Sequence, residues 1–471
     1  MWHALYSAAL YAALPFLLAR LWWRGRREPA YRRRIGERLG LYPEPVGGAS
    51  PERALAWVHA VSVGETRAAQ PLIEALAAAY PQASFVLTHM TPTGRAVGEG
   101  VAQRLPGRVV QRYLPYDLRP SVRRFLAETR PAIGVILETE LWPQLLAAAR
   151  SAGVPMVLAN ARLSEKSLAK ALRYEALVRR AARAFVRVSA QSEADRARIE
   201  KLYDGRIDVL GNLKFDLTPS AELVERGVIA RAALGNRPVW LFASSREGEE
   251  RLVLDAFAAA KSAKLGSDPN FSKTAKTGSD PNFLKMGSDP IFLIVPRHPQ
   301  RFDEVARLIE ARGFVCARRS QGALARAAPA NAVLLGDSMG EMAMYYAAAD
   351  VALIGGSLLP FGAQNLIEAC AVGTPVVLGP STYNFAQAAA DALAAGAAIQ
   401  VDNAAQALAA MDALCRDPAR REAMRRAALS FAAAHRGATE RTVALIEQVL
   451  AQRPARAEGE ELRARARDRN V

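Results

Sequence analysis

The chain has 471 residues, enough for roughly two or three domains, and 51% of them are hydrophobic, which excludes a disordered protein. Its 62 Lys and Arg against 46 Asp and Glu give a net charge of +16, which favours an anionic partner such as an acidic membrane, a phosphorylated substrate or nucleic acid. The three cysteines, Cys316, Cys370 and Cys415, are spaced too widely to indicate a disulfide framework or a zinc site, so we expect a reduced compartment.

The first 19 residues carry no Asp, Glu, Lys or Arg, and together with Leu21, Trp22 and Trp23 they approach the roughly 20 residues that cross a bilayer. An arginine cluster follows, and the positive-inside rule places it, and the chain after it, in the cytoplasm. We therefore expect a membrane anchor over residues 1–23, spanning or in the membrane plane, whose arginines attract anionic lipids. A cleaved signal peptide and a buried or interfacial helix are the alternatives; the missing basic segment at the start argues against the first.

Buried strands and helices alternate from residue 55 onward. A strand is predicted over residues 55–63, a turn at Gly64 and a helix over 66–80, which places Glu65 at the carboxyl end of the first strand, where α/β enzymes carry chemistry. A carboxylate at a helix start is also a common stabilising choice. Further strands are predicted over 84–88, 109–114, 131–137, 155–159, 185–188 and 207–210, and a basic helix over 166–184.

Two polar motifs follow predicted strands in this first half. ETELWP, residues 138–143, places Glu138 at a strand end, where a helix-capping role is the simpler interpretation. GNLKFD, residues 211–216, contains Lys214, and a single lysine in a loop is usually only solvated.

The segment 221–238 is interpreted as a connection between domains, after which residue 239 opens a second set of strands and helices. Strands are predicted over 239–243, 291–295, 314–317, 332–335, 351–354 and 375–378, and helices over 249–261, 365–372, 386–395, 404–416, 418–434 and 439–451. GSDPNF occurs twice and GSDPIF once within residues 264–292; we interpret 264–290 as a surface loop without catalytic role, a partner-binding loop being the alternative. The charged tail 452–471 is predicted to be disordered.

Three stretches of the second half are suited to an anion. The turn Gly355-Gly356-Ser357 is predicted to offer open N–H groups near a helix start, and Asn365 and Glu368 share a face at that start. Arg297 follows a strand, where its fork of donors suits a phosphate. Residues 339–341 also lead into a predicted helix, whose first N–H groups suit a phosphate or a nucleobase. For the glycine turn at 355–357, an ordinary β–α–β unit without a ligand is the alternative.

Together these motifs resemble the Kdo (3-deoxy-D-manno-octulosonate) transferases, inverting glycosyltransferases of the GT-B fold that build the inner core of lipopolysaccharide. The matched stretches are HAVSVGET at 59–66, MTPTG at 90–94, ETELWP, GNLKFD, VPRHP at 295–299, and GGSL at 355–358 with the residues after it. The chain departs from the family pattern in Arg246 for His, in Ala363-Gln364 for Gly-His and in Ala369 for Pro.

The resemblance implies an α/β protein of two Rossmann-like domains, 24–220 for the acceptor and 221–451 for the donor, with the last helix returning to the first domain. It implies Glu65 as general base, with Glu138 and Lys214 stabilising charge in the transition state. Residues implied in binding the donor's cytidine monophosphate are Pro296, Arg297, Met339, Gly340, Glu341, Asn365, Leu366, Ile367 and Glu368. The implied reaction transfers Kdo from CMP-Kdo to a hydroxyl of the lipid A precursor, lipid IVA, at the bacterial inner membrane.

No cofactor or metal is expected, because the sequence has no D-x-D pair and a monophosphate leaving group needs less charge neutralisation than a diphosphate. Two other classes remain: a different GT-B nucleotide-sugar transferase or epimerase, and a catalytically silent membrane-associated binding protein. Nucleic acid is not expected as a partner, because the basic residues gather at the chain ends without an aromatic-interleaved platform. The number of Kdo units transferred stays open.

Overall fold

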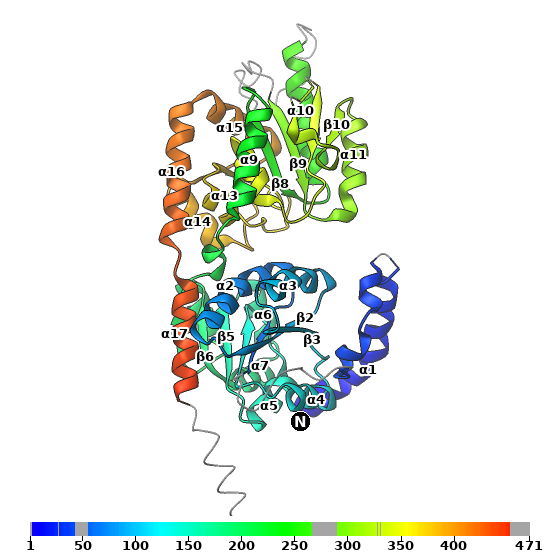
Figure 1. Cartoon of the computed structure of the whole chain (residues 1–471), viewed down its shortest axis with the longest axis vertical. Helices are drawn as coiled ribbons and strands as arrows, with labels where there is room; N and C mark the ends of the chain where they lie inside the picture. The colour runs from blue at the N-terminus through cyan, green and yellow to red at the C-terminus, as the bar shows by residue number, and fades with distance from the viewer. Residues whose placement is uncertain are drawn as a thin grey trace, which may run out of the picture. The chain divides into compact units, whose positions relative to one another are not determined.

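The computed structural model describes residues 2–26, 28–42, 55–265, 290–326, 328–329 and 331–452. These residues form two compact units, unit 1 from Met1–Leu217 with Arg436–Val471 and unit 2 from Thr218–His435 (Figure 1). The repeat segment from residue 266 to 289 and the predicted tail from residue 453 lie outside the described residues.

Unit 1 is built on a parallel seven-stranded sheet with the order β3-β2-β1-β4-β5-β6-β7. Its strands are β1 Leu55–His59, β2 Ser84–His89, β3 Val109–Tyr113, β4 Ile133–Leu137, β5 Met156–Ala161, β6 Phe185–Ala190 and β7 Ile207–Val209. Side chains alternate across the sheet, so that Trp57 packs in the core on one face and Val58 in the core on the other. Burial on both faces explains why the strands read as apolar runs in the sequence.

The helices of unit 1 cover both faces of this sheet. They are α2 Val63–Ala79, α3 Pro92–Arg104, α4 Arg119–Thr129, α5 Pro143–Ser151, α6 Glu165–Leu172, α7 Glu175–Ala182, α8 Glu193–Ile199 and α17 Ala438–Ala451, with the 3₁₀ turn η3 Leu213–Asp216. The single basic helix predicted over 166–184 is wrong, because the chain breaks at Arg173 and Tyr174 into α6 and α7.

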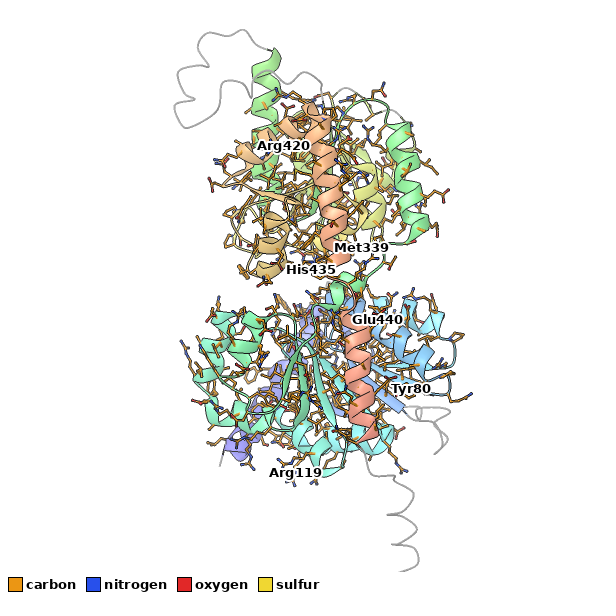
Figure 2. The ribbon with its side chains drawn as sticks, turned by 90° about the vertical axis from the view of Figure 1, so that its left-hand side faces the viewer. Tyr80, Arg119, Met339, Arg420, His435 and Glu440 are labelled. Carbon is orange, nitrogen blue, oxygen red and sulfur yellow. The ribbon has the colours of Figure 1, made fainter. Side chains whose placement is uncertain are left out.

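Helix α17 packs in the same core as α2, with Ala438, Leu445 and Ile446 buried there. Figure 2 shows it running along unit 1, with Glu440 labelled in its first turn and Tyr80 at the end of α2. The second unit therefore ends at His435, and residues 436–451 belong to unit 1, which is the place that the family resemblance implies for the last helix.

The turn between β1 and α2 differs from the prediction. The strand ends at His59 rather than residue 63, and Val63 and Gly64 already lie in the first turn of α2. Glu65, the third residue of the helix, accepts there from the Ser62 hydroxyl and from the N–H of Val61, and these bonds fix the chain just before α2.

The chain begins with α1, Trp2–Arg24, followed by the 3₁₀ turns η1 Pro29–Arg32 and η2 Ile35–Leu39. By length and composition Leu5–Arg24 could cross a membrane, and 6% of its most apolar window is buried. This is weak evidence for the predicted anchor.

Unit 2 repeats the design with the parallel order β10-β11-β9-β8-β12-β13-β14. The strands are β8 Val239–Ser245, β9 Ile291–Pro296, β10 Val315–Arg318, β11 Ala332–Leu335, β12 Val351–Ile354, β13 Val376–Leu378 and β14 Ala398–Gln400. The helices are α9 Ala221–Ala233, α10 Glu249–Leu265, α11 Phe302–Glu310, α12 Met342–Ala348, α13 Ile367–Val372, α14 Ala386–Ala394, α15 Ala404–Arg416 and α16 Pro418–Ala434, with the 3₁₀ turns η6 Pro299–Arg301, η7 Arg319–Gln321 and η8 Ala323–Ala325.

The interpretation of 221–238 as a connection is wrong, because α9 is an integral helix of unit 2 that packs on α12. A Cβ at Gly227 would come within 2.4 Å of the Met344 carbonyl oxygen, so the glycine lets the two helices approach closely. The predicted α/β class is confirmed, since both units are parallel sheets covered by helices.

Candidate active site

Glu65 and Glu138 lie at the same edge of the unit 1 sheet. β1 and β4 are neighbours in this sheet, and the strand order reverses between them. Glu65 is the third residue of α2, which follows β1, and Glu138 comes directly after β4. Ligands of open α/β sheets bind at the carboxyl ends of strands at such a reversal, so these side chains stand where chemistry is expected.

The Glu65 carboxylate is fixed at the start of α2. The N–H of Val61 donates to its Oε2 at 2.8 Å, and the Ser62 hydroxyl donates to its Oε1 at 3.0 Å. Burial, with the charge of Glu138 as a further cause, raises the pKa of Glu65 to about 7. The side chain thus stabilises the helix start, and its pKa is matched to accepting a proton near neutral pH.

Glu138 is paired with Lys214. The Lys214 ammonium donates to Glu138 Oε1 at 2.7 Å, and the Glu138 side chain is almost fully buried. Burial alone would raise the pKa of Glu138, but the charges of Lys214 and Arg162 hold it below the usual value, so the carboxylate stays ionised. Its backbone φ of 63° lies in the left-handed region, a strain of the kind that recurs at functional sites.

The helix-capping interpretation of the ETELWP glutamates is wrong. Asp117 caps α5, because its two carboxylate oxygens accept from the N–H groups of Gln144 at 2.9 Å and Leu145 at 2.7 Å. Glu140 is nevertheless part of the acidic group, since burial, with a contribution from Glu138, raises its pKa. This edge of the sheet therefore holds Glu138, which stays ionised, and Glu65 and Glu140, whose pKa values are raised. Carboxylates whose pKa values differ in this way can take different acid–base roles.

Two residues that the sequence analysis did not single out hold Lys214 in place. Asn160, near the end of β5 and with a left-handed φ of 54°, accepts from the Leu213 N–H through its Oδ1 at 3.1 Å. Asp216 accepts from the N–H groups of Gly437 and Thr439 and so caps α17. The C-terminal helix thereby supports the turn that carries the lysine; a long-range contact of this kind leaves no signal in the local sequence.

In unit 2 the glycine turn after β12 is already occupied by a carboxylate of the chain itself. Glu249, fully buried at the start of α10, accepts from the N–H groups of Gly356 at 2.7 Å and Leu358 at 3.0 Å. It also accepts from the N–H of Arg246 at 2.9 Å. The prediction that this turn offers open N–H groups to an anion is therefore wrong, because Glu249 fills that position.

Side chains supply the positive charge of this edge instead. Arg297 follows β9, and its Nε donates to Gln364 Oε1 at 3.1 Å. The Arg246 guanidinium stacks 4.6 Å from the centre of the Phe361 ring. Burial, together with the charges of Arg297, Arg246 and Arg301, lowers the pKa of His298.

Part of that charge is compensated. Arg301 makes two bonds to the buried Glu250, at 2.6 and 3.1 Å, and so takes a structural role. Arg297 and Arg246 are the two arginines that the geometry favours for a phosphate, and their neighbour Gln364 stands where the family pattern has His.

The other predicted donor residues lie in unit 2 as follows. Asn365 lies two residues before α13 begins; its Oδ1 accepts from the Ile367 N–H at 3.0 Å, and its amide donates to Glu368 at 3.2 Å, which confirms the shared face. Leu366 and Ile367 are fully buried, so only their backbone can meet a ligand, and Pro296 is buried at the end of β9.

The turn from Met339 to Glu341 leads into α12. Met339 is 52% exposed, and Figure 2 labels it at the edge of unit 2. Glu341 is bonded to Arg226 at 2.7 Å and to Arg319 at 3.2 Å, and these arginines with the Ser338 hydroxyl hold its pKa below the usual value although burial opposes them. Gly340 has a φ of 82°, which the turn requires of it.

Among the residues that the structure describes, no group of three or more His, Cys, Asp or Glu could hold a metal ion. A metal-independent reaction stays a prediction.

Comparison with known proteins identifies relatives over nearly the whole chain. A family model described as 3-Deoxy-D-manno-octulosonic-acid transferase (kdotransferase) matches residues 33–217, and one described as Glycosyl transferases group 1 matches residues 317–431. The 3-deoxy-D-manno-octulosonic acid transferase of Bordetella pertussis is 43% identical over 461 residues, which is 96% of this chain and 100% of that protein. The protein of the same name from Haemophilus influenzae is 32% identical and covers 96% of this chain and 99% of its own length.

A solved structure shows the same fold. The crystal structure of a glycosyltransferase from Rickettsia africae has a TM-score of 0.54 at 12% identity and covers 86% of this chain and 100% of that one. This likeness shows the fold alone, and it confirms the predicted GT-B class. The sequence identity to these relatives, the share of the chain they cover and the family model all indicate the same family. The chain belongs to the Kdo transferase family of glycosyltransferases.

Proposed function

We propose that the protein transfers Kdo from CMP-Kdo to a hydroxyl of a lipid A precursor, with inversion at the sugar carbon and without a metal ion. The observation that carries this proposal is Glu65, a fixed carboxylate with a pKa of about 7 beside the ion pair of Glu138 and Lys214. Family membership supports the sugar and the donor, since relatives at 43% and 32% identity are named as Kdo transferases.

On the acceptor side, the hydroxyl oxygen of the lipid attacks the sugar carbon while Glu65 takes its proton. The bond between that carbon and the phosphate oxygen of CMP-Kdo breaks, and CMP leaves with the electron pair. Glu138 remains ionised because of Lys214 and Arg162, so its negative charge stabilises the positive charge that develops on the sugar. Lys214 keeps this carboxylate ionised and in place.

On the donor side, Arg297 and Arg246 bind the phosphate of CMP. The guanidinium fork matches a phosphate in geometry as well as charge, and Gln364 orients Arg297 from the side. Because Glu249 fills the glycine turn, the turn supplies shape rather than N–H donors to the nucleotide. Met339, Gly340 and the α13 start around Asn365 and Glu368 complete the donor contacts.

Helix α1 associates with the bacterial inner membrane, and both units work on its cytoplasmic side, where a lipid A precursor is presented. The apolar stretch Leu5–Arg24 and the arginines after it support membrane association through apolar burial and attraction to anionic lipids.

The test is a transfer assay on the full chain in detergent, with a tetra-acylated lipid A precursor and CMP-Kdo generated as it is consumed. Product mass is read for the wild type, for Glu65→Gln and for Glu74→Gln. Glu74 lies on the same helix but is paired at the surface with Arg104, 2.7 Å away, so it is the matched control.

We expect Kdo mass increments with the wild type and with Glu74→Gln, and none or almost none with Glu65→Gln. The number of increments counts the sugars transferred. Binding of CMP against UDP, measured by calorimetry, is the second readout: preference for UDP with no Kdo increment from folded wild type would contradict the proposal and favour another nucleotide-sugar enzyme.

A further inference from the structure

One side of helix α1 is partly or fully buried from Tyr6 to Leu21. Within the part of α1 whose side chains are described, the partly or fully buried positions are Tyr6, Ser7, Leu10, Ala13, Leu14, Leu17, Leu18 and Leu21. These positions recur every three or four residues, so they form one stripe of the helix. A helix that crosses a bilayer alone would instead be surrounded by lipid.

The first turns of α1 are hydrogen-bonded to the folded part of unit 1. The Tyr6 hydroxyl donates to Asp117 Oδ2 at 2.9 Å, and the Gln144 side chain donates to Ser7 Oγ at 2.7 Å. Asp117 is itself 2% exposed, because it also caps α5. Figure 1 shows the start of α1 near α4 and α5. The amino-terminal end of α1 is thus attached to the Rossmann-like unit itself.

The other end of α1 is also attached to the chain that enters unit 1. The Arg32 guanidinium donates twice to the Trp22 carbonyl oxygen, at 3.1 and 3.0 Å, and Arg24 stacks 4.7 Å from the centre of the Tyr31 ring. Tyr6 and Arg24 are separated by about 27 Å of helix at 1.5 Å per residue. In a spanning helix Tyr6 would lie in the far leaflet, and its bond to Asp117 could not form.

The opposite side of α1 exposes large apolar side chains. The most exposed is Phe16, at 77%, and Leu5, Tyr11, Trp22 and Trp23 are also exposed. The described helix has no Asp or Glu, and its arginines, Arg20 and Arg24, lie near its carboxyl end. Apolar and tryptophan side chains beside arginine are the composition that enters the boundary between lipid headgroups and acyl chains of an anionic bilayer.

The geometry points to α1 as an in-plane docking helix, whose outer face enters the headgroup boundary of an anionic bilayer while its inner face stays on unit 1. The outer face includes Leu5, Ala8, Tyr11, Ala12, Phe16, Ala19 and Trp23. This inference rests on the membrane association proposed above and concerns its geometry: the protein lies on one leaflet and does not cross to the other.

Spin-label depth measurements on vesicles of phosphatidylethanolamine and phosphatidylglycerol test the inference. Single cysteines are placed at Ala8→Cys, Ala12→Cys and Ala19→Cys in the full chain, after its three native cysteines, all in unit 2, are replaced and transfer activity in detergent is checked. An in-plane helix gives the three labels equal depth, to within about 5 Å. A spanning helix separates the first and last by about 16 Å along the membrane normal.

Ala13→Cys is the matched control, because Ala13 is the neighbour of Ala12 on the inner face. In-plane docking leaves the label at 13 several-fold less accessible to oxygen than the label at 12, whereas a spanning helix makes both accessible. Tyr6→Phe, with Tyr11→Phe as its control on the exposed side, adds a readout of mobility: we expect faster label motion at position 8 in Tyr6→Phe only.

Graded depths, equal accessibility at 12 and 13, or no effect of Tyr6→Phe would overturn the in-plane geometry. Labels that all remain in water would overturn it too, and would at the same time refute membrane association, whereas Kdo transfer in detergent would be unaffected.

Discussion

The pKa of Glu65 gives a quantitative prediction for the pH dependence of transfer. A general base works only in its ionised form, so kcat/KM should fall tenfold per pH unit below its pKa. With the pKa at about 7, about 1% of Glu65 is ionised at pH 5, whereas an ordinary glutamate would be mostly ionised there. The two cases differ by a factor of about 75 at that pH, far beyond the error of initial rates.

The measurement uses initial rates with limiting acceptor and preformed CMP-Kdo added at time zero, because the donor hydrolyses during long incubations. Glu138→Gln is the diagnostic variant: it removes a negative neighbour of Glu65 and should move the acid limb to lower pH while the plateau falls. Glu140→Gln removes a weaker neighbour and should shift the limb in the same direction by less. Glu74→Gln should leave the profile unchanged.

If kcat/KM of the wild type falls only below about pH 4.5, the argument that burial and Glu138 raise the pKa of Glu65 is refuted. If kcat/KM falls below about pH 7 in both the wild type and Glu138→Gln, the charge of Glu138 has no such role, and burial alone raises the pKa of Glu65.

Three further predictions concern contacts of the candidate catalytic residues in unit 1 and of the glycine turn in unit 2. Lys214→Met should let burial raise the pKa of Glu138 and lower kcat by about 10²–10³-fold with unchanged calorimetric affinity for CMP, since the lysine belongs to unit 1; a matching loss of CMP affinity would contradict this. Glu249→Gln offers one oxygen where two now accept, so it should leave N–H groups of the glycine turn unpaired. It should lower the free energy of unfolding, measured by denaturant titration, by about 1–3 kcal/mol for each unpaired group, and weaken CMP binding. Asp216→Ala removes the cap of α17 and should cost about 0.5–2 kcal/mol in urea unfolding, together with part of kcat; full activity in a destabilised protein would show that α17 does not support Lys214.

The alternation of strands and helices was readable from the sequence because parallel strands covered on both faces must be apolar, as in β12 and β13, and because polar motifs interrupt those runs at their carboxyl ends. The catalytic candidates followed from motif resemblance, and the structure brings Glu65, Glu138 and Lys214 to one edge of one sheet; their catalytic roles stay a prediction.

What the sequence could not supply are contacts between residues far apart in the chain. Nothing near Gly356 indicates that a carboxylate 107 residues earlier fills its turn. Likewise, nothing near Lys214 indicates that the helix beginning at Ala438 supports it through Asp216. The break between α6 and α7 and the early start of α2 are local differences.

The glycine turn filled by Glu249 offers a physical reason for two departures from the family pattern, Gln364 and Arg246. Because Glu249 takes the N–H groups of Gly356 and Leu358, the proposed function assigns recognition of the donor phosphate to side chains at the neighbouring strand ends. Gln364, in place of a histidine, is an acceptor for Arg297 at every pH, whereas a protonated histidine would repel that guanidinium. Arg246, in place of another histidine, adds a permanent charge and stacks on Phe361. Both departures therefore replace a histidine, which titrates near neutral pH, with a residue that does not. The pH dependence of catalysis in this chain should then come from unit 1, where Glu65 lies.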